Sequence, residues 1–307
     1  MQRLILLVFT TTAFATLFAQ NEQLTIVSEN DSYTSINNDG YYTNGIGLAF
    51  KWRPRNSDSV VLNRTNQVEI GQKIFNARHG LYWSLSSMDR PITGYLYASF
   101  QQTNFNKRQD LLRWEVSAGT IGKPAFGKEM QNLIHKIVNI SKVTQWEYQL
   151  EPGFGLNATV TWSPQIFKPA GLKKFDIKPV ATASLGNNFT NAIVGSAVLF
   201  GKFNENRRSS FWNNHFSNDK AGRELFVYFY PAVCIQAYNA TVQGNLFNDS
   251  PEIVEGKLNP ALFHGKAGVE YAVKKYSLSY AVVYEGRQSL TQKNRQFYGS
   301  IQLAFRW

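Results

Sequence analysis

A two-residue alternation between large apolar and small or polar side chains is the feature that most constrains this chain. The last eleven residues, FYGSIQLAFRW, keep this alternation and end on the aromatic Trp307. The pattern recurs in residues 46–52, 112–119, 154–162 and 276–284. Successive side chains of an extended strand point to opposite faces. These segments are therefore predicted to be strands with one apolar face, as in a β-barrel or a β-sandwich.

Composition favours a membrane β-barrel over a soluble β-sandwich. Of the 307 residues, 14% are aromatic and only 17% are charged, while the mean hydropathy is −0.30. In a membrane barrel only alternate residues face lipid, and aromatic rings collect at both interfaces. A helical membrane protein would need apolar runs of about 18 residues, and none follows the N-terminus. A soluble sandwich would not need so aromatic a last strand.

Twelve strands are predicted, an even number, as in single-chain bacterial barrels. Their expected ranges are 22–30, 42–53, 66–76, 93–105, 110–121, 149–163, 174–186, 190–203, 223–239, 261–273, 276–287 and 296–307. The expected fold is an all-β, twelve-stranded antiparallel transmembrane barrel. With both ends in the periplasm, residues 31–41, 77–92 and 122–148 would form loops outside the cell.

The N-terminus has the pattern of a signal peptide. Arg3 precedes an apolar run that ends near the small residue Ala19, so residues 1–19 are the expected signal and 20–307 the barrel domain. The net charge of +11 suits contact with anionic outer-membrane lipids. Without a clustered Lys/Arg run, nucleic acid is not an expected partner.

One segment breaks the β pattern. Residues 128–140, KEMQNLIHKIVNI, carry apolar residues at helical spacing from Met130 to Val138. Gln131 and His135 lie four apart and share another face. We expect an amphipathic helix in an extracellular loop, with its apolar stripe on the barrel rim and its polar stripe facing the space between helix and wall.

Polar residues gather at one end of the first two strands. Asn30 and Asp31 follow the outward end of the first, and Thr43 begins the second, so antiparallel pairing brings them together. His135 is expected at the same rim. These residues could form a site, but Asn-Asp-Ser stretches are also ordinary turn formers. A lone loop histidine is more often a packing residue. Without metal-ligand spacing among the histidines, zinc is not expected.

A longer set of motifs resembles the outer-membrane lipid A 3′-O-deacylase family. In order, they are Glu29–Asn30–Asp31, Asp39–Gly40–Tyr41–Tyr42–Thr43–Asn44–Gly45, Gly71–Gln72, Asp89–Arg90–Pro91, Gly94–Tyr95–Leu96–Tyr97, Gly122–Lys123–Pro124, Gln131–Asn132, His135, Trp146, Gln149–Leu150 and Glu151–Pro152. They keep the family order to about residue 160, and beyond it only the barrel pattern remains.

The resemblance implies an esterase that removes 3′-linked acyl chains from lipid A, within lipopolysaccharide, with Ca²⁺ as cofactor. It implies that Asn30 and Asp31 hold calcium, that His135 activates water, and that Gln131 and Thr43 complete the catalytic site. The chemistry is coherent, because calcium prefers oxygen ligands and a neutral imidazole can accept a proton from water. We expect a monomer in the bacterial outer membrane, with its active site facing the cell exterior.

The chain departs from the family pattern at three places. They are Ser32, in place of an acid; residues 77–92, which lack a lysine; and Ser141 or Lys142, in place of another acid. Arg78 or Arg90 could supply the missing cation. Two alternatives therefore stay open: an inactive or passive barrel acting as a pore or structural protein, and an outer-membrane phospholipase, which would need a Ser–His pair.

Overall fold

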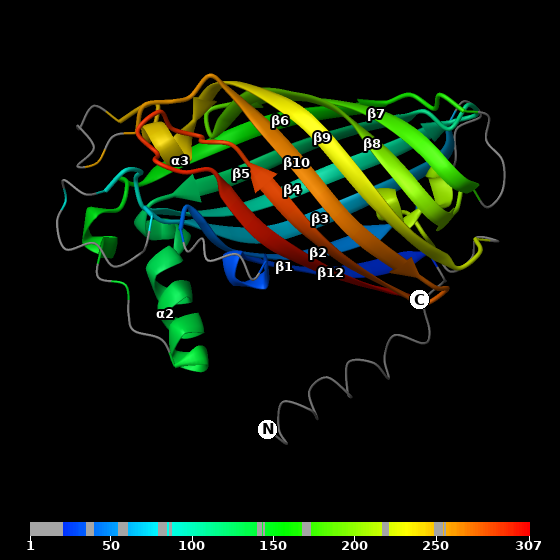
Figure 1. Ribbon diagram of the computed structural model, residues 1–307, viewed down its shortest axis with the longest axis horizontal. Helices are drawn as coiled ribbons and strands as arrows, with labels where there is room; N and C mark the ends of the chain where they lie inside the picture. Colours follow the sequence, from blue (N-terminus) through cyan, green and yellow to red (C-terminus); the bar gives the residue numbers. More distant parts are fainter. Residues whose placement is uncertain are drawn as a thin grey trace.

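The chain folds into a closed antiparallel barrel, as the alternation predicted (Figure 1). The computed structural model describes residues 21–34, 40–54, 61–78, 85, 88–139, 143, 145–167, 173–216, 221–248, 254 and 256–307. Within them, twelve strands each pair with their neighbours in sequence, and β1 pairs with β12. The expected signal peptide, 1–19, lies outside these residues.

The strand and helix bounds follow the predicted ranges closely. The strands are β1 Glu22–Asn30, β2 Tyr42–Trp52, β3 Val61–Phe75, β4 Thr93–Asn106, β5 Leu111–Ile121, β6 Gly153–Ser163, β7 Lys173–Gly186, β8 Phe189–Phe203, β9 Glu224–Asn239, β10 Ala261–Ala272, β11 Tyr276–Glu285 and β12 Gln296–Arg306. The α-helices are α2 Gly127–Val138 and α3 Ala240–Gln243, and the 3-10 helices include η2 Asp31–Thr34, η6 Asn206–Arg208 and η7 Ser210–Trp212.

Two strand starts differ from the prediction by more than one residue. β6 begins at Gly153 rather than at residue 149, because Gln149 forms an isolated bridge with Ile92 and the Leu150 N–H donates to the Ile92 carbonyl over 2.9 Å. β3 begins at Val61 rather than at residue 66. Residues 63–67 of this strand are all polar, and Asn63, Thr65 and Gln67 are buried. This polar run interrupts the apolar alternation from which the strand was predicted.

The large apolar side chains point out of the barrel. On β2, Ile46 and Leu48 are exposed, whereas Ala49 and Lys51 are buried. Aromatic rings form a row across neighbouring strands near the end that carries Trp307. Ring centroids lie 5.8 Å apart in Phe50–Trp52, 6.3 Å in Trp52–Phe100 and 5.4 Å in Phe100–Trp114. This is the girdle expected at a membrane interface.

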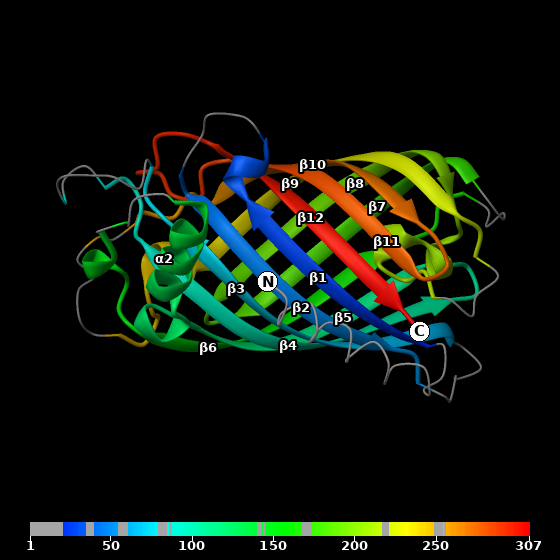
Figure 2. The same ribbon diagram turned by 90° about the horizontal axis from the view of Figure 1, so that it is seen from below.

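Pairing of the first and last strands closes the barrel. The Trp307 indole N–H donates to Glu22 Oε2 over 2.8 Å, and Gln23 pairs with Arg306. We call this the terminus end of the barrel. Helices α2 and α3 lie at the opposite end, here called the helix end (Figure 1). Figure 2 shows α2 beside β3 and β4, the strands that it contacts.

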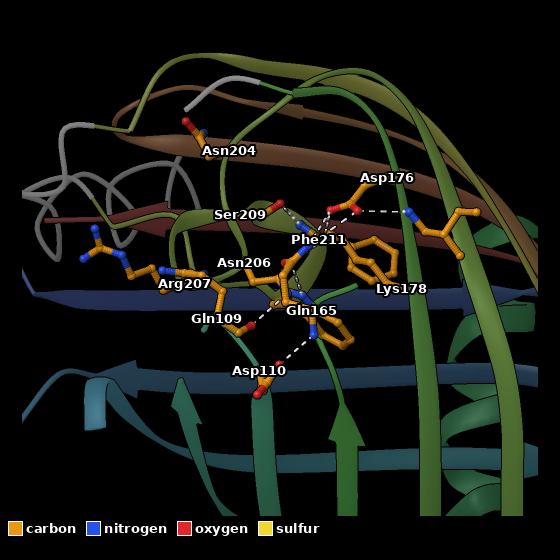
Figure 3. A network of polar contacts seen from close by, with 12 residues as sticks. Gln109, Asp110, Gln165, Asp176, Lys178, Asn204, Asn206, Arg207, Ser209 and Phe211 are labelled. Carbon is orange, nitrogen blue, oxygen red and sulfur yellow. Dashed lines mark hydrogen bonds and ion pairs between the residues drawn. The ribbon is translucent and has the colours of Figure 1, made fainter. Parts of the chain in front are cut away.

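The connection between β8 and β9 fills the lumen at the terminus end. Residues 204–216, here called the plug, fold through η6 and η7 into a polar network (Figure 3). Asn206 Nδ2 donates to the Gln109 carbonyl over 3.0 Å and its Oδ1 accepts from Lys178. Lys51 Nζ donates to the Asn213 carbonyl over 2.7 Å. These bonds tie the plug to the barrel wall.

An aromatic layer fills the lumen at the helix end. It contains Tyr42, Phe75, Tyr95, Ile121 and Leu150, with further tyrosine and phenylalanine rings packed against it. The Tyr42–Phe75 centroids are 5.4 Å apart, edge to face. Between this layer and the plug, a cavity of about 470 Å³ remains, lined partly by charged and polar side chains.

Candidate functional site

Three predicted site residues lie at the adjoining ends of β1 and β2. The pairing register runs from Glu22–Trp52 to Asn30–Asn44. Asp31 follows the last paired residue of β1, and Thr43 stands directly before Asn44. Asp31 opens η2 and is buried. The predicted proximity of the two strand ends is therefore confirmed.

Asn30 and Asp31 both take part in local hydrogen bonds. Asn30 Oδ1 accepts from the Ser32 N–H over 2.8 Å and from the Ser32 hydroxyl. Asp31 Oδ2 accepts from the Gly40 N–H over 3.2 Å, which ties the end of the β1–β2 connection back to its start. Ser32, the residue that replaces a family acid, thus orients the Asn30 amide.

Thr43 has a different environment. It is the extra residue of a β-bulge where β2 pairs with β3, since Tyr42 opposes Phe75 and Asn44 opposes Ile74. Its hydroxyl is buried and makes no hydrogen bond with the described residues. Bulges re-aim side chains and are frequent beside active sites, and a buried unpaired hydroxyl costs free energy. The bulge therefore leaves the Thr43 oxygen buried and without a hydrogen-bond partner among the described residues.

Asp89 links three connections at the helix end and had no assigned role from the sequence. Its Oδ2 accepts from the Tyr41 hydroxyl over 2.6 Å and from the Lys293 N–H over 3.0 Å. Its Oδ1 accepts from the Arg78 N–H over 3.2 Å. The only signal in the sequence was its place in the family motif Asp89–Arg90–Pro91.

Tyr41 is held in an unusual backbone conformation by this carboxylate. Its φ is 71°, a left-handed value that bulky residues rarely adopt. Burial, and then the hydrogen bond to Asp89, raise the pKa of Tyr41, so its hydroxyl stays a donor. Asp89 therefore fixes the residue that enters β2 two positions before Thr43.

Of the two candidate cations, Arg90 is buried inside the helix end. Its Cζ lies 4.6 Å from the Phe75 ring centroid, and Nη2 donates to Thr241 Oγ1 over 2.9 Å. Burial lowers the pKa of Arg90 to about 10, and it remains a cation. Arg78 is half-buried, and its guanidinium faces Asn294 on the β11–β12 connection. Arg78 is thus the more accessible candidate.

The base of α2 packs closely against β4 and β3. A Cβ on Gly127 would lie 2.5 Å from the Trp146 ring, and one on Gly94 would lie 3.0 Å from Gly127 Cα. These two glycines therefore permit the contact. Gln72 Nε2 on β3 donates to the Ala125 carbonyl over 2.5 Å, just before the helix.

Gln131 and His135 follow on one face of α2. Trp146 Nε1 donates to Gln131 Oε1 over 2.8 Å, and both residues are buried. His135 is half-buried, one turn further from the barrel. Trp146 also packs with Ile74 and Ile92. Because Ile74 on β3 opposes Asn44, the base of α2 packs on the strand next to the end of β2 that carries Thr43.

The apolar stripe of α2 does not lie on the rim as expected. Met130 packs against the Ile74–Trp146 cluster, but Leu133 and Ile137 are exposed. The sequence expectation is wrong here because the helix axis leads away from the barrel wall (Figure 1). Only the residues nearest its base can then reach the rim. Ser141 and Lys142, where a family acid is missing, lie outside the described residues.

The donor atoms at the strand end suit a hard cation better than a transition metal. Among the described residues, no group of three His, Cys, Asp or Glu side chains could hold a metal ion. Asp31 offers a carboxylate and Asn30 an amide oxygen at the end of β1, and Thr43 adds a hydroxyl at the adjoining end of β2. Calcium accepts such carboxylate, amide and carbonyl oxygens, so these residues fit it.

The described part of the chain contains no helix that is both long and apolar enough to cross a membrane.

A family model and solved structures were compared with this chain. The family described as "Outer membrane protein LpxR" matches residues 4–307. The solved structure of LpxR from Salmonella typhimurium is similar with a TM-score of 0.77 at 19% identity, covering 93% of this chain and 100% of that chain. The β domain of the Bordetella autotransporter BrkA gives a TM-score of 0.49 at 11% identity, covering 93% and 98%. No curated protein sequence matches significantly.

Proposed function

Because the chain belongs to the LpxR family of outer membrane proteins, we propose that it is a calcium-dependent esterase that removes 3′-linked acyl chains from lipid A. The observation that carries the proposal is the pairing of two groups at the helix end. One is the strand-end set of Asn30, Asp31 and Thr43. The other is the polar face of α2 with Gln131 and His135, whose base packs one strand away.

The residues of α2 would act on the water and the ester. His135 takes a proton from the attacking water, which needs no nucleophilic side chain. Gln131 is held by the Trp146 indole, so it fixes the rotation of the helix and with it the direction of His135. The Thr43 hydroxyl makes no hydrogen bond within the described residues. In this proposal it positions the substrate, or a molecule bound by Asn30 and Asp31.

Asn30 and Asp31 would hold the calcium ion. When bound, the ion supplies positive charge that favours the developing oxyanion of the ester. Because Ser32 stands where the family has an acid, the site carries less negative charge. We therefore expect weaker calcium binding than in relatives that keep the acid.

The helix end faces the cell exterior in this proposal. Lipid A, as part of lipopolysaccharide, then reaches the site laterally from the outer leaflet. The protein acts as a monomer in this proposal.

Mass spectrometry of lipid A tests the proposal directly. Cells that make the wild-type protein should contain lipid A lighter by the 3′-linked acyl groups, and cells that make His135→Ala should not. General-base catalysis contributes about a hundred- to ten-thousand-fold in rate, so the loss should be close to complete. Glu129→Ala, on an exposed position of the same helix, is the matched control.

Both variants should keep the heat-modifiable mobility of a folded barrel. Unchanged lipid A with folded wild-type protein would contradict the esterase function. Normal deacylation by His135→Ala would contradict only the role of the histidine.

A further inference from the structure

An exposed apolar edge runs along α2, on the side away from its polar residues. Phe126, Leu133 and Ile137 are 59%, 52% and 75% exposed. The spacing of seven and then four residues places them on one edge of the helix. Exposed single apolar residues are common, but three on one edge of one helix form a continuous surface that marks an interaction site.

The other side of α2 is polar, and one flank of the apolar edge carries exposed charged residues. Gln131 and His135 lie on the polar side, while Lys128, Glu129 and Lys136 are exposed between that side and the edge. An amphipathic helix with lysines beside an apolar edge is typical of a segment that lies in a membrane interface. Lysine side chains there can reach lipid phosphates while their stems stay near apolar surface.

The position of α2 in the fold agrees with a helix that lies in a membrane interface. The helix projects from the wall at the helix end of the barrel (Figures 1 and 2). Its base meets Gly94, at the start of β4. On the neighbouring strands, Ile70 and Leu48 point outward and are exposed, as lipid-facing side chains of a membrane barrel are. The exposed edge of α2 thus extends the lipid-facing surface outward from the wall.

We infer that the Phe126–Leu133–Ile137 edge enters the acyl-chain region of the outer leaflet, so that α2 is an interfacial anchor. The inserted edge sets the depth of the polar face relative to the membrane. This inference depends on the outer-membrane location and not on the esterase activity. Its consequence for catalysis, that insertion holds His135 at the level of the lipid ester groups, rests on the proposed function.

Site-specific fluorescence can test the insertion. The sequence contains a single cysteine, Cys234, so Cys234→Ser gives a background without thiols. Ile137→Cys and, as matched control, Lys136→Cys are each labelled with a nitrobenzoxadiazole fluorophore and reconstituted into vesicles that contain acyl-chain spin-labelled lipids. At position 137 we expect blue-shifted emission and strong quenching, and at position 136 emission close to that in water with weak quenching.

Two results would overturn the inference. Equal emission and quenching at both positions would show that the edge stays in water. Blue-shifted emission at position 137 without quenching by the lipid spin labels would show that protein covers the edge. If this blue shift increased with protein density in the vesicles, the covering protein would be a second copy of the chain. Leu133→Cys provides an independent labelled position and should behave like position 137.

An activity measurement addresses the catalytic consequence separately. Leu133→Ser combined with Ile137→Ser should lower deacylation of lipid A in vesicles by about tenfold or more, because the apolar contribution to interfacial binding is lost. Activity on lipid A dispersed in detergent should stay near the wild-type value. If wild-type protein shows no deacylation at all, the proposed function fails, while the fluorescence result still decides the insertion.

Discussion

At the scale of single residues, the unpaired Thr43 hydroxyl gives a sharp test of the site. Thr43→Val keeps the shape but removes the hydroxyl, which has no protein partner among the described residues. Stability should therefore change little. A hydrogen bond to a charged group contributes about 1.5–3 kcal/mol, so deacylation should fall by roughly ten- to a hundredfold. Thr43→Ser should keep most activity.

The measurements are initial rates on purified lipid A and the temperature at which heat-modifiability is lost. A Val variant with wild-type rates would remove Thr43 from the site. A Val variant that unfolds at a clearly lower temperature would show instead that the hydroxyl has a structural partner.

The metal prediction also belongs to single residues. Chelation should abolish deacylation, and calcium should restore it better than magnesium, which dehydrates reluctantly and demands tighter geometry. Asp31→Asn should raise the calcium concentration needed for half-maximal activity, because it removes the carboxylate charge of the strand-end set. Ser32→Asp should lower that concentration. Full activity in excess chelator would disprove the calcium requirement.

At the scale of elements, the Trp146–Gln131 bond should decide how firmly α2 is held. Trp146→Phe removes the donor and leaves the buried Gln131 carbonyl without its partner, which costs about 1–3 kcal/mol. We expect faster cleavage of the α2 segment in limited proteolysis, while the barrel stays protease-resistant. Activity should fall with the loss of helix position.

A matched change elsewhere separates this local effect from general damage. Trp162→Phe, on the lipid-facing side of β6, should leave cleavage of the α2 segment unchanged. Equal protection of α2 in the Trp146 and Trp162 variants would show that the indole bond does not hold the helix.

At the scale of the whole molecule, the barrel is filled at both ends. The plug occupies the terminus end through bonds such as Lys51 to Asn213, and the aromatic layer around Tyr42 and Phe75 occupies the helix end. We therefore expect no steady ion conductance in planar bilayers, in contrast to a general porin studied in parallel. Stable open-channel currents from the wild-type protein would support the passive-pore alternative.

The local pattern of the sequence determined the fold and part of the site. A period of two determines which face of a strand is apolar, so the twelve strands and their outward faces could be predicted from segments such as 46–52. Because one connection joins adjacent antiparallel strands, the adjoining ends of β1 and β2, paired at Asn30 and Asn44, also followed from the sequence. β3 was predicted too short, since the polar run of residues 63–67 interrupts the apolar alternation.

Contacts between distant segments were decided by the tertiary structure alone. Asp89 joins Tyr41 to Lys293, and the plug, which connects β8 to β9 in the sequence, folds into the lumen. The sequence could not predict either contact, because both depend on how separate connections meet after the barrel closes. The direction of α2 is of the same kind. Helical spacing determines that Leu133 and Ile137 share an edge, but whether protein or lipid covers that edge depends on where the barrel places the helix.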